Sequence, residues 1–388
     1  MNWLVTGGCG FIGVNLVKRL LAEGNHSIRI IDNLSVGTRE DLAAISSFTE
    51  SSASEVSSTL FPSAHAPTLP ALVVGDILDE QLALEVARGV DVIVHLAANA
   101  GVGSSVQGPR SDCLVNVIGT LNYLEAARVN EVRRFVFASS CAAVGERQPP
   151  IDEEAVPHPV SPYGASKLSG EGYCSAYYGT FGIQTVVLRF ANAYGPFSGH
   201  KNSVVAGFIR QAVAAQPFQV HGDGEQTRDF IHVDDLIEAI RLAACQPHAG
   251  GEIFQIATGR ETSVLALLEL LFLELAEAGH SRREAVHSAP RPAELRRVFA
   301  DISKAKRMLG WEPRIELTEG LRRTLQWFLA NPISREPLAE LSYSVTPAKA
   351  GVQKSLGELD SGLRRNDVQG LLQEAPEIQR CCRSQIGE

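Results

Sequence analysis

The segment Thr6-Gly7-Gly8-Cys9-Gly10-Phe11-Ile12-Gly13 decides the fold of this chain. It joins a short apolar run at residues 3–5, typical of a buried strand, to a helical apolar pattern at residues 11–22. Glycines in such a turn let a diphosphate approach the backbone amides at the start of the following helix. The segment therefore predicts a strand–turn–helix unit that binds a dinucleotide, although a glycine motif alone can also be only a turn.

An acidic residue downstream strengthens the dinucleotide interpretation. Asp32 follows the apolar run 28–31 and lies 19 residues after Gly13. A carboxylate at the end of the second strand can accept hydrogen bonds from the adenosine ribose hydroxyls, and it would repel a 2′-phosphate. We therefore expect NAD rather than NADP as the cofactor. The alternative is that Asp32 is a turn or helix-capping residue.

Strand and helix patterns alternate through the first half of the chain. Apolar runs predict further buried strands at residues 72–74, 90–96, 134–138 and 186–188. Helices are predicted between them at residues 81–88 and 113–129. This alternation is typical of an α/β fold with a doubly wound parallel sheet of the Rossmann type. We assign residues 1–188 to this NAD-binding domain, with the Ser-, Thr-, Ala- and Pro-rich residues 46–70 as an insertion.

The rest of the chain has a mixed pattern. Helices are predicted at residues 204–215, 233–244, 264–278 and 317–330. We assign residues 189–332 to a smaller mixed α/β substrate-binding domain that is interleaved with the first. Apolar periodicity then fades, and residues 333–388 are expected to be a disordered tail.

The composition excludes several classes of protein. Among 388 residues, 45% are hydrophobic and 20% are charged, and the net charge of −9 argues against nucleic-acid binding. The most apolar stretch, residues 264–276, is too short to cross a membrane and contains two glutamates. The glycine motif begins too early to leave room for a signal peptide, and the seven cysteines lack CxxC spacing. We expect a cytoplasmic protein with reduced thiols.

A second motif predicts acid–base chemistry. Ser139 and Ser140 end a predicted strand, and Ser161-Pro162 form a typical helix start. Tyr163 and Lys167 are then four residues apart on one helix face. Ionising a free tyrosine, of pKa about 10, near neutrality costs roughly 4 kcal/mol, and a nearby ammonium lowers that cost. Tyr163 could thus act as a general base on a hydroxyl that Ser140 orients. A Tyr–Lys pair by itself is common on any helix; its place after a dinucleotide motif favours the catalytic interpretation.

Together these residues resemble a known family. Further motifs follow in order: Asp32-Asn33-Leu34-Ser35, Gly75-Asp76-Ile77, His95-Leu96-Ala97-Ala98, residues 189–196, residues 222–235 and residues 300–305. With TGGCGFIG and the Tyr–Lys pair, the set resembles the NAD-dependent nucleotide-sugar epimerase/dehydratase family of extended short-chain dehydrogenases/reductases, and most closely the UDP-glucose 4-epimerases and other UDP-sugar 4-epimerases. The resemblance covers residues 1 to about 330.

The resemblance implies roles for individual residues. NAD would be held by Gly7, Gly10, Phe11, Ile12, Gly13, Asp32, Asn33, Ser35, Gly37, Asp76, Ile77, Leu96, Ala97, Ala98, Asn116, Tyr163 and Lys167. Ser140, Tyr163 and Lys167 would be catalytic. A nucleotide-sugar substrate would be held by Ser140, Asn192, Asn202, Arg228 and Arg291, although either arginine could instead be an ordinary surface residue. Relatives commonly form homodimers through the helices near residues 113–129 and 162–181, so a homodimer is expected.

The resemblance also bears on the reaction. Dehydratases of this family carry an Asp-Glu pair directly after the strand-ending Ser/Thr, and decarboxylases carry a nearby Glu, whereas this chain has Cys141 and Ala142. We therefore expect C4 epimerisation through a transient 4-keto sugar. A related reductase, decarboxylase or dehydratase and a non-catalytic NAD-binding regulator remain the alternatives. Many relatives have a tyrosine before Gly145, where this chain has Val144. His95, His232 and Asp234-Asp235 lack metal-ligand spacing, so no metal site is expected.

Overall fold

The computed structural model describes residues 1–52, 55, 69–290 and 294–331. A parallel sheet has the strand order β12-β7-β6-β5-β1-β2-β4-β3. Its strands are β1 (Asn2–Thr6), β2 (Ser27–Asp32), β3 (Thr49–Glu50), β4 (Ala71–Val74), β5 (Val92–His95), β6 (Arg134–Ser140), β7 (Gln184–Phe190) and β12 (Ile253–Ile256). The chain runs outward on one side of β1 and then crosses to β5 on its other side. The prediction of a doubly wound parallel sheet is therefore confirmed.

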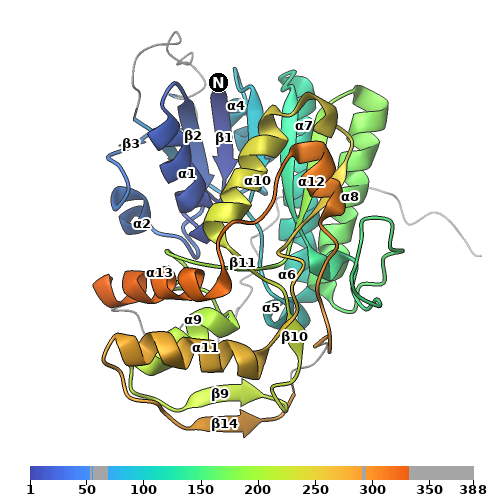
Figure 1. The fold of residues 1–388 in the computed structure, drawn as a ribbon. Helices are drawn as coiled ribbons and strands as arrows, with labels where there is room; N and C mark the ends of the chain where they lie inside the picture. Colours follow the sequence, from blue (N-terminus) through green and yellow to red (C-terminus); the bar gives the residue numbers. More distant parts are fainter. Residues whose placement is uncertain (53–54, 56–68, 291–293, 332–388) are drawn as a thin grey trace, which may run out of the picture. The chain divides into compact units, whose positions relative to one another are not determined.

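Helices cover both faces of this sheet (Figure 1). One hydrophobic core packs the sheet against α1 (Phe11–Glu23), α10 (Val233–Cys245) and α12 (Ser303–Leu309). A second core packs it against α4 (Glu80–Val86), α7 (Gly119–Val129) and α8 (Pro162–Phe181). Trp3 and Val5 of β1 belong to the first core and Leu4 to the second, because successive side chains of a strand point to opposite faces.

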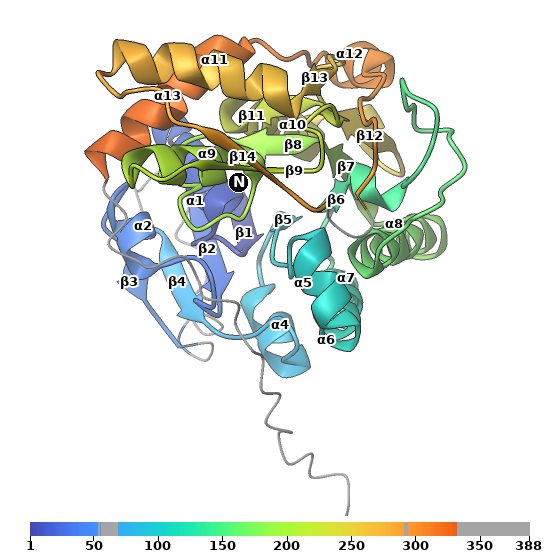
Figure 2. The same cartoon turned by 90° about the horizontal axis from the view of Figure 1, so that it is seen from below.

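The second half of the chain builds a third core. It joins α9 (Val204–Val213), α11 (Val264–Glu277) and α13 (Leu317–Ala330) with β9 (Phe218–His221), which pairs in parallel with β14 (Ala285–Ser288). Figure 1 and Figure 2 both show α9, α11 and α13 near the β9–β14 pair. Short pairs connect this region to the sheet: β8 (Asn192–Tyr194) with β11 (Phe230–His232), and β10 (Thr227–Arg228) with β13 (Thr262–Ser263).

The structure refines several expected boundaries. The predicted helix 113–129 consists of α6 (Pro109–Cys113), a π-helical segment at Leu114–Ile118 and α7. Two short helices, α2 (Arg39–Ala43) and α5 (Val102–Gln107), had no clear apolar pattern. The proposed insertion is not wholly irregular, because its residues Thr49 and Glu50 form β3 beside β4.

The domain boundary at residue 188 remains a prediction. Residues beyond it also complete the large sheet, through β12, and cover it, through α10 and α12. The expected tail at residues 333–388 lies outside the described residues. Within the described part of the chain, no helix is long and apolar enough to span a bilayer.

Candidate active site

The glycine turn after β1 leaves no room for side chains. Gly7 has a φ of 68°, a conformation that glycine adopts at little cost. A Cβ on Gly13 would lie 2.2 Å from Gly7 O, and one on Gly37 would lie 2.2 Å from Cys9 O. Gly10 precedes α1 without any capping side chain. The first amides of α1 are thus left for an anion, and the turn is shaped for a diphosphate.

The ends of β2 and β4 bring together four of the predicted cofactor residues. Asp32 is buried, and its carboxylate accepts hydrogen bonds from Cys9 N at 2.9 Å and from Leu34 N at 2.8 Å. Burial raises the pKa of Asp32, and these two amides act against the rise. Asn33 accepts a 2.7 Å hydrogen bond from Ser35 Oγ and donates to Asp76 Oδ2 at 3.2 Å. The arrangement presents acceptors where a ribose would lie.

The loop after β5 closes against the glycine turn. Leu96 N and Ala97 N each donate to Thr6 Oγ1 at 3.1 Å. Asn116, in the π-helical segment, is buried; its Oδ1 accepts from Asn99 N at 2.8 Å, and its Nδ2 contacts Ser166 Oγ at 3.1 Å. Asn116 therefore ties the loop that follows Ala98 to helix α8. Its direct contact with NAD remains a prediction.

The predicted catalytic residues meet where β6 ends and α8 begins. Ser161 caps α8 by accepting a 3.1 Å hydrogen bond from Gly164 N, and Pro162 is the first helical residue, as expected. Lys167 Nζ donates to Ala138 O at 2.8 Å and lies 5.9 Å from the centre of the Tyr163 ring. Ser140 lies close enough to Tyr163 for its hydroxyl to act to lower the pKa of the phenol. The structure thus assembles the predicted trio.

Burial sets the protonation of this trio. It raises the pKa of Tyr163 to about 12, against the opposing effect of the Ser140 side chain. It lowers the pKa of Lys167 to about 8, while the carboxylates of Asp112 and Glu171 act to raise it. At neutral pH the phenol is therefore protonated and the lysine is mostly charged. A positive group beside the phenol would favour its ionisation.

The proposed substrate residues lie on neighbouring elements. Asn192 of β8 is exposed and pairs in register with Phe230 of β11. Asn202 is exposed in the loop before α9. Arg228, in β10, donates to Glu294 Oε1 at 3.0 Å and to Leu295 O at 2.8 Å, so its guanidinium is held by the protein. Arg291 lies outside the described residues.

Comparison with known proteins identifies the family. The model described as "NAD dependent epimerase/dehydratase family" matches residues 3–257. The chain belongs to this family. It is 36% identical to UDP-glucose 4-epimerase of Mycolicibacterium smegmatis over 333 residues, or 84% of this chain and 98% of that protein. The family confirms the expected extended short-chain dehydrogenase/reductase fold and the cofactor NAD.

This chain is similar to solved structures of epimerases and also to solved structures of dehydratases. UDP-glucose 4-epimerase from Thermotoga maritima with UDP-glucose has a TM-score of 0.74 at 34% identity, covering 85% of this chain and 99% of that one. DesIV of Streptomyces venezuelae, a dTDP-glucose 4,6-dehydratase with NAD and TYD bound, has a TM-score of 0.75 at 30% identity, covering 85% and 98%. The family's chemistry is thus that of NAD-dependent epimerases and dehydratases.

The glycine turn of this family member leads to a prediction about cofactor binding. We expect Gly13→Ala to weaken NAD binding by about 10- to 100-fold, since a clash of this kind costs about 1–3 kcal/mol. The new Cβ would also lie 2.5 Å from Gly8 Cα, and backbone atoms cannot easily move away. Titration of NAD-free protein with NAD measures the effect. Gly207→Ala in α9, where a Cβ meets nothing within 4 Å, is the control; equal NAD affinity in both variants would contradict the prediction.

A buried polar network next to the predicted catalytic trio was not found from the sequence. Ser139 Oγ donates to Glu171 Oε1 at 2.5 Å, and Arg189 binds both oxygens of Glu171, at 2.9 and 2.7 Å. The Glu171 and Arg189 side chains are each only 3% exposed. Glu171 lies one helical turn after Lys167, which was the one available signal. The network joins β6, β7 and α8 at the point where they carry Ser140 and Lys167.

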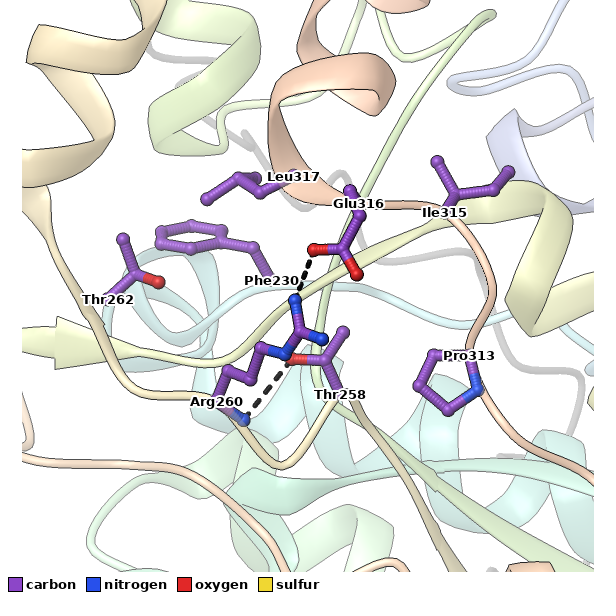
Figure 3. A pocket seen from close by; sticks show the side chains of 8 residues that line it. All are labelled: Phe230, Thr258, Arg260, Thr262, Pro313, Ile315, Glu316 and Leu317. Atoms are coloured by element: carbon purple, nitrogen blue, oxygen red, sulfur yellow. Dashed lines mark hydrogen bonds and ion pairs between the residues drawn. The ribbon is translucent and has the colours of Figure 1, made fainter.

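Two other features are separate from this site. A surface hollow near the start of α13 is bordered by the exposed ion pair of Arg260 and Glu316 and contains no predicted site residue (Figure 3). His95 is buried among aromatic rings, and burial lowers its pKa to about 3. His232 caps α10. Neither histidine belongs to a group of three or more potential metal ligands within the described residues.

Proposed function

We propose that this protein is an NAD-dependent 4-epimerase of a nucleotide sugar, a UDP-hexose or a UDP-N-acetylhexosamine. One observation supports the reaction type above others. The Ser140–Tyr163–Lys167 trio is assembled, while the segment directly after Ser140 carries no carboxylate. Cys141 there is buried, and burial raises the pKa of its thiol to about 12. Neither this thiol nor Ala142 can serve as the acid that eliminates water in a dehydratase.

Each residue of the trio then has a defined role. Tyr163 removes the proton from the C4 hydroxyl of the sugar and later returns it to the same oxygen. Ser140 orients that hydroxyl, and the ammonium of Lys167 stabilises the phenolate. NAD, which the glycine turn and Asp32 would hold, would supply reversible hydride transfer at C4 of the sugar. The reaction therefore has no net oxidation, and the proton balance closes on Tyr163.

We assign the substrate contacts to the residues that the sequence analysis named. We assign the diphosphate of the substrate to Arg228 and Arg291, and further contacts to Asn192 and Asn202, because charge-assisted hydrogen bonds suit phosphate oxygens. Arg228 would have to release Glu294, which now binds it at 3.0 Å. The glycine turn, too tight for a Cβ at Gly13, and the acceptors at Asp32 fit the diphosphate and ribose of NAD.

We also propose that the enzyme is a cytoplasmic homodimer. The outer surfaces of α7 and α8 expose large apolar side chains, among them Val129 at 55% and Phe181 at 50% exposure. Such side chains are suited to cover one another in a helical interface. The five described cysteines are free thiols, which fits a reducing compartment. Sedimentation analysis of the purified chain tests the dimer.

A product assay tests the proposed reaction. The purified protein, with its bound NAD quantified, is incubated with a panel of UDP-, GDP- and dTDP-sugars, and products are identified by NMR. We expect the C4 epimer of a UDP-sugar to accumulate without stoichiometric release of NADH. A 4-keto-6-deoxy product would instead assign the chain to the dehydratases, and released NADH would assign it to the net reductases or decarboxylases of the family.

A further inference from the structure

Lys201 lies in a loop that is fixed against the start of α1. Ser198 Oγ donates to Gly195 O at 2.6 Å, and Arg210 Nη1 donates to Lys201 O at 2.9 Å. Asn15 of α1 connects the two elements, since its Nδ2 contacts Phe11 O at 2.8 Å and Pro196 O at 3.0 Å. These bonds hold the backbone of Lys201 beside the first turn of the helix that follows the glycine motif.

The ammonium of Lys201 sits between that turn and β8. Nζ donates to Ala193 O at 2.8 Å and lies 5.1 Å from the centre of the Phe11 ring. Ala193 adjoins Asn192, one of the proposed substrate residues. Burial alone lowers the pKa of Lys201 to about 8, with no acidic group acting to raise it. In the described part of the chain, Lys201 has no carboxylate within ion-pair distance.

The surroundings of Lys201 can be compared with those of two other lysines, Lys167 and Lys304. The catalytic Lys167 also donates to one carbonyl at 2.8 Å, lies 5.0 Å from the centre of the Phe137 ring, and has its pKa lowered to about 8. Lys304 likewise lies over a ring, 5.4 Å from the centre of Phe254, but it pairs with Glu252 at 2.8 Å. Lys201 therefore resembles the active-site lysine rather than the ion-paired one.

An unpaired, desolvated ammonium is unfavourable for the folded protein. A lysine has three N–H donors, and among the described residues only one acceptor, Ala193 O, takes a bond from Lys201. A partly buried cation without a counter-charge costs free energy unless an anion is bound beside it. Unpaired charges of this kind with shifted pKa values mark binding sites. The missing negative charge is then expected to come from a ligand.

We propose that Lys201 binds diphosphate oxygens of a ligand between the first turn of α1 and strand β8. The inference rests on the proposed function, which places NAD at α1 and a nucleotide sugar at β8; both ligands carry a diphosphate. Lys201 would supply a charge-assisted hydrogen bond from an N–H that no described residue accepts, whereas Arg228 is already held by Glu294. Lys201 is thus a ligand-binding residue that the motif analysis did not include.

Binding measurements on three variants test this role. We expect Lys201→Met to weaken either UDP binding to the NAD-loaded protein or NAD binding to the NAD-free protein by about 10- to 100-fold, as for a lost hydrogen bond to a charged group. Whichever ligand loses affinity is the one that Lys201 contacts. Lys201→Arg keeps the charge and should stay within a few fold of the parent. Lys304→Met is the matched control and should leave both affinities unchanged.

Unfolding of the ligand-free variants gives an independent readout. Because Lys201 has no counter-charge among the described residues, Lys201→Met should leave the Tm unchanged or raise it. Lys304→Met leaves Glu252 without its partner and should lower the Tm. If UDP and NAD both bind Lys201→Met within twofold of the parent, the proposal is wrong. These measurements need no turnover. If the parent epimerises no sugar but Lys201→Met still binds UDP or NAD more weakly, the proposed reaction is wrong and the Lys201 site is supported.

Discussion

Replacing Tyr163 with phenylalanine is expected to lower kcat by about 10²- to 10⁴-fold, the range that a positioned acid–base group contributes. The ring remains and only the hydroxyl is lost, so the helix start at Ser161 and Pro162 should be undisturbed. Ser140 acts to lower the pKa of this hydroxyl, and the Lys167 ammonium lies 5.9 Å from the centre of the ring. The measurement is single-turnover and steady-state epimerisation of the sugar found in the product assay.

Two comparisons make the Tyr163→Phe result specific. Tyr173→Phe changes an exposed tyrosine on the same helix and should retain the parent kcat. Tyr173→Phe should keep bound NAD at the parent level, and Tyr163→Phe should lower it only modestly, because one expected NAD contact is lost while the glycine turn and Asp32 are untouched. A Tyr163→Phe protein with normal kcat would sink the assignment of the phenol as the acid–base group. If the parent and the Tyr163→Phe variant bind NAD and UDP-sugars equally well and neither catalyses a reaction, the chain is the non-catalytic regulator of the alternative hypothesis.

The second large effect concerns stability. We expect Glu171→Gln to lower the free energy of unfolding by about 3–5 kcal/mol, because it leaves the guanidinium of Arg189 buried without a counter-charge. The two side chains are each 3% exposed and joined at 2.7 Å. Urea unfolding at a fixed NAD concentration measures the loss as a shift of the midpoint.

A surface ion pair provides the control for Glu171→Gln. Glu269 pairs with Arg282 at 2.5 Å, but their side chains are 59% and 65% exposed. Exposed pairs of this kind contribute about 0–1 kcal/mol, so Glu269→Gln should barely shift the midpoint. An equally small shift for Glu171→Gln would show that water reaches Arg189 in the unpaired state, which contradicts the burial on which the prediction depends.

Much of the fold was predictable because its signals are local. A strand, a glycine turn and a helix follow one another within residues 2–23, and the same succession recurs up to β7. Right-handed crossovers leave few ways to connect such units, so a parallel sheet follows. The boundaries were less predictable. The β3 strand pairs only two residues with β4, and so short a segment has no periodicity of its own.

The spacing of the proposed catalytic trio was predictable for a similar reason, and the groups around it were not. Four-residue spacing places Tyr163 and Lys167 on one helix face whatever the rest of the chain does. Glu171 repeats that spacing, but nothing in the sequence shows that Arg189 of β7 lies opposite it. The pairing depends on the β6–β7 register, in which Ser139 faces Arg189.

The sequence by itself therefore determined the parallel sheet, the NAD turn and the Tyr163–Lys167 pair, because short-range spacing dictates each of them. Only the tertiary structure decided which charges are compensated. It gave Glu171 a partner in Arg189 and Lys304 a partner in Glu252, and it placed Lys201 against Phe11 without an acidic neighbour in the part of the chain that is described. Whether a charge has a partner depends on residues far apart in the chain, and that is settled only when the elements pack.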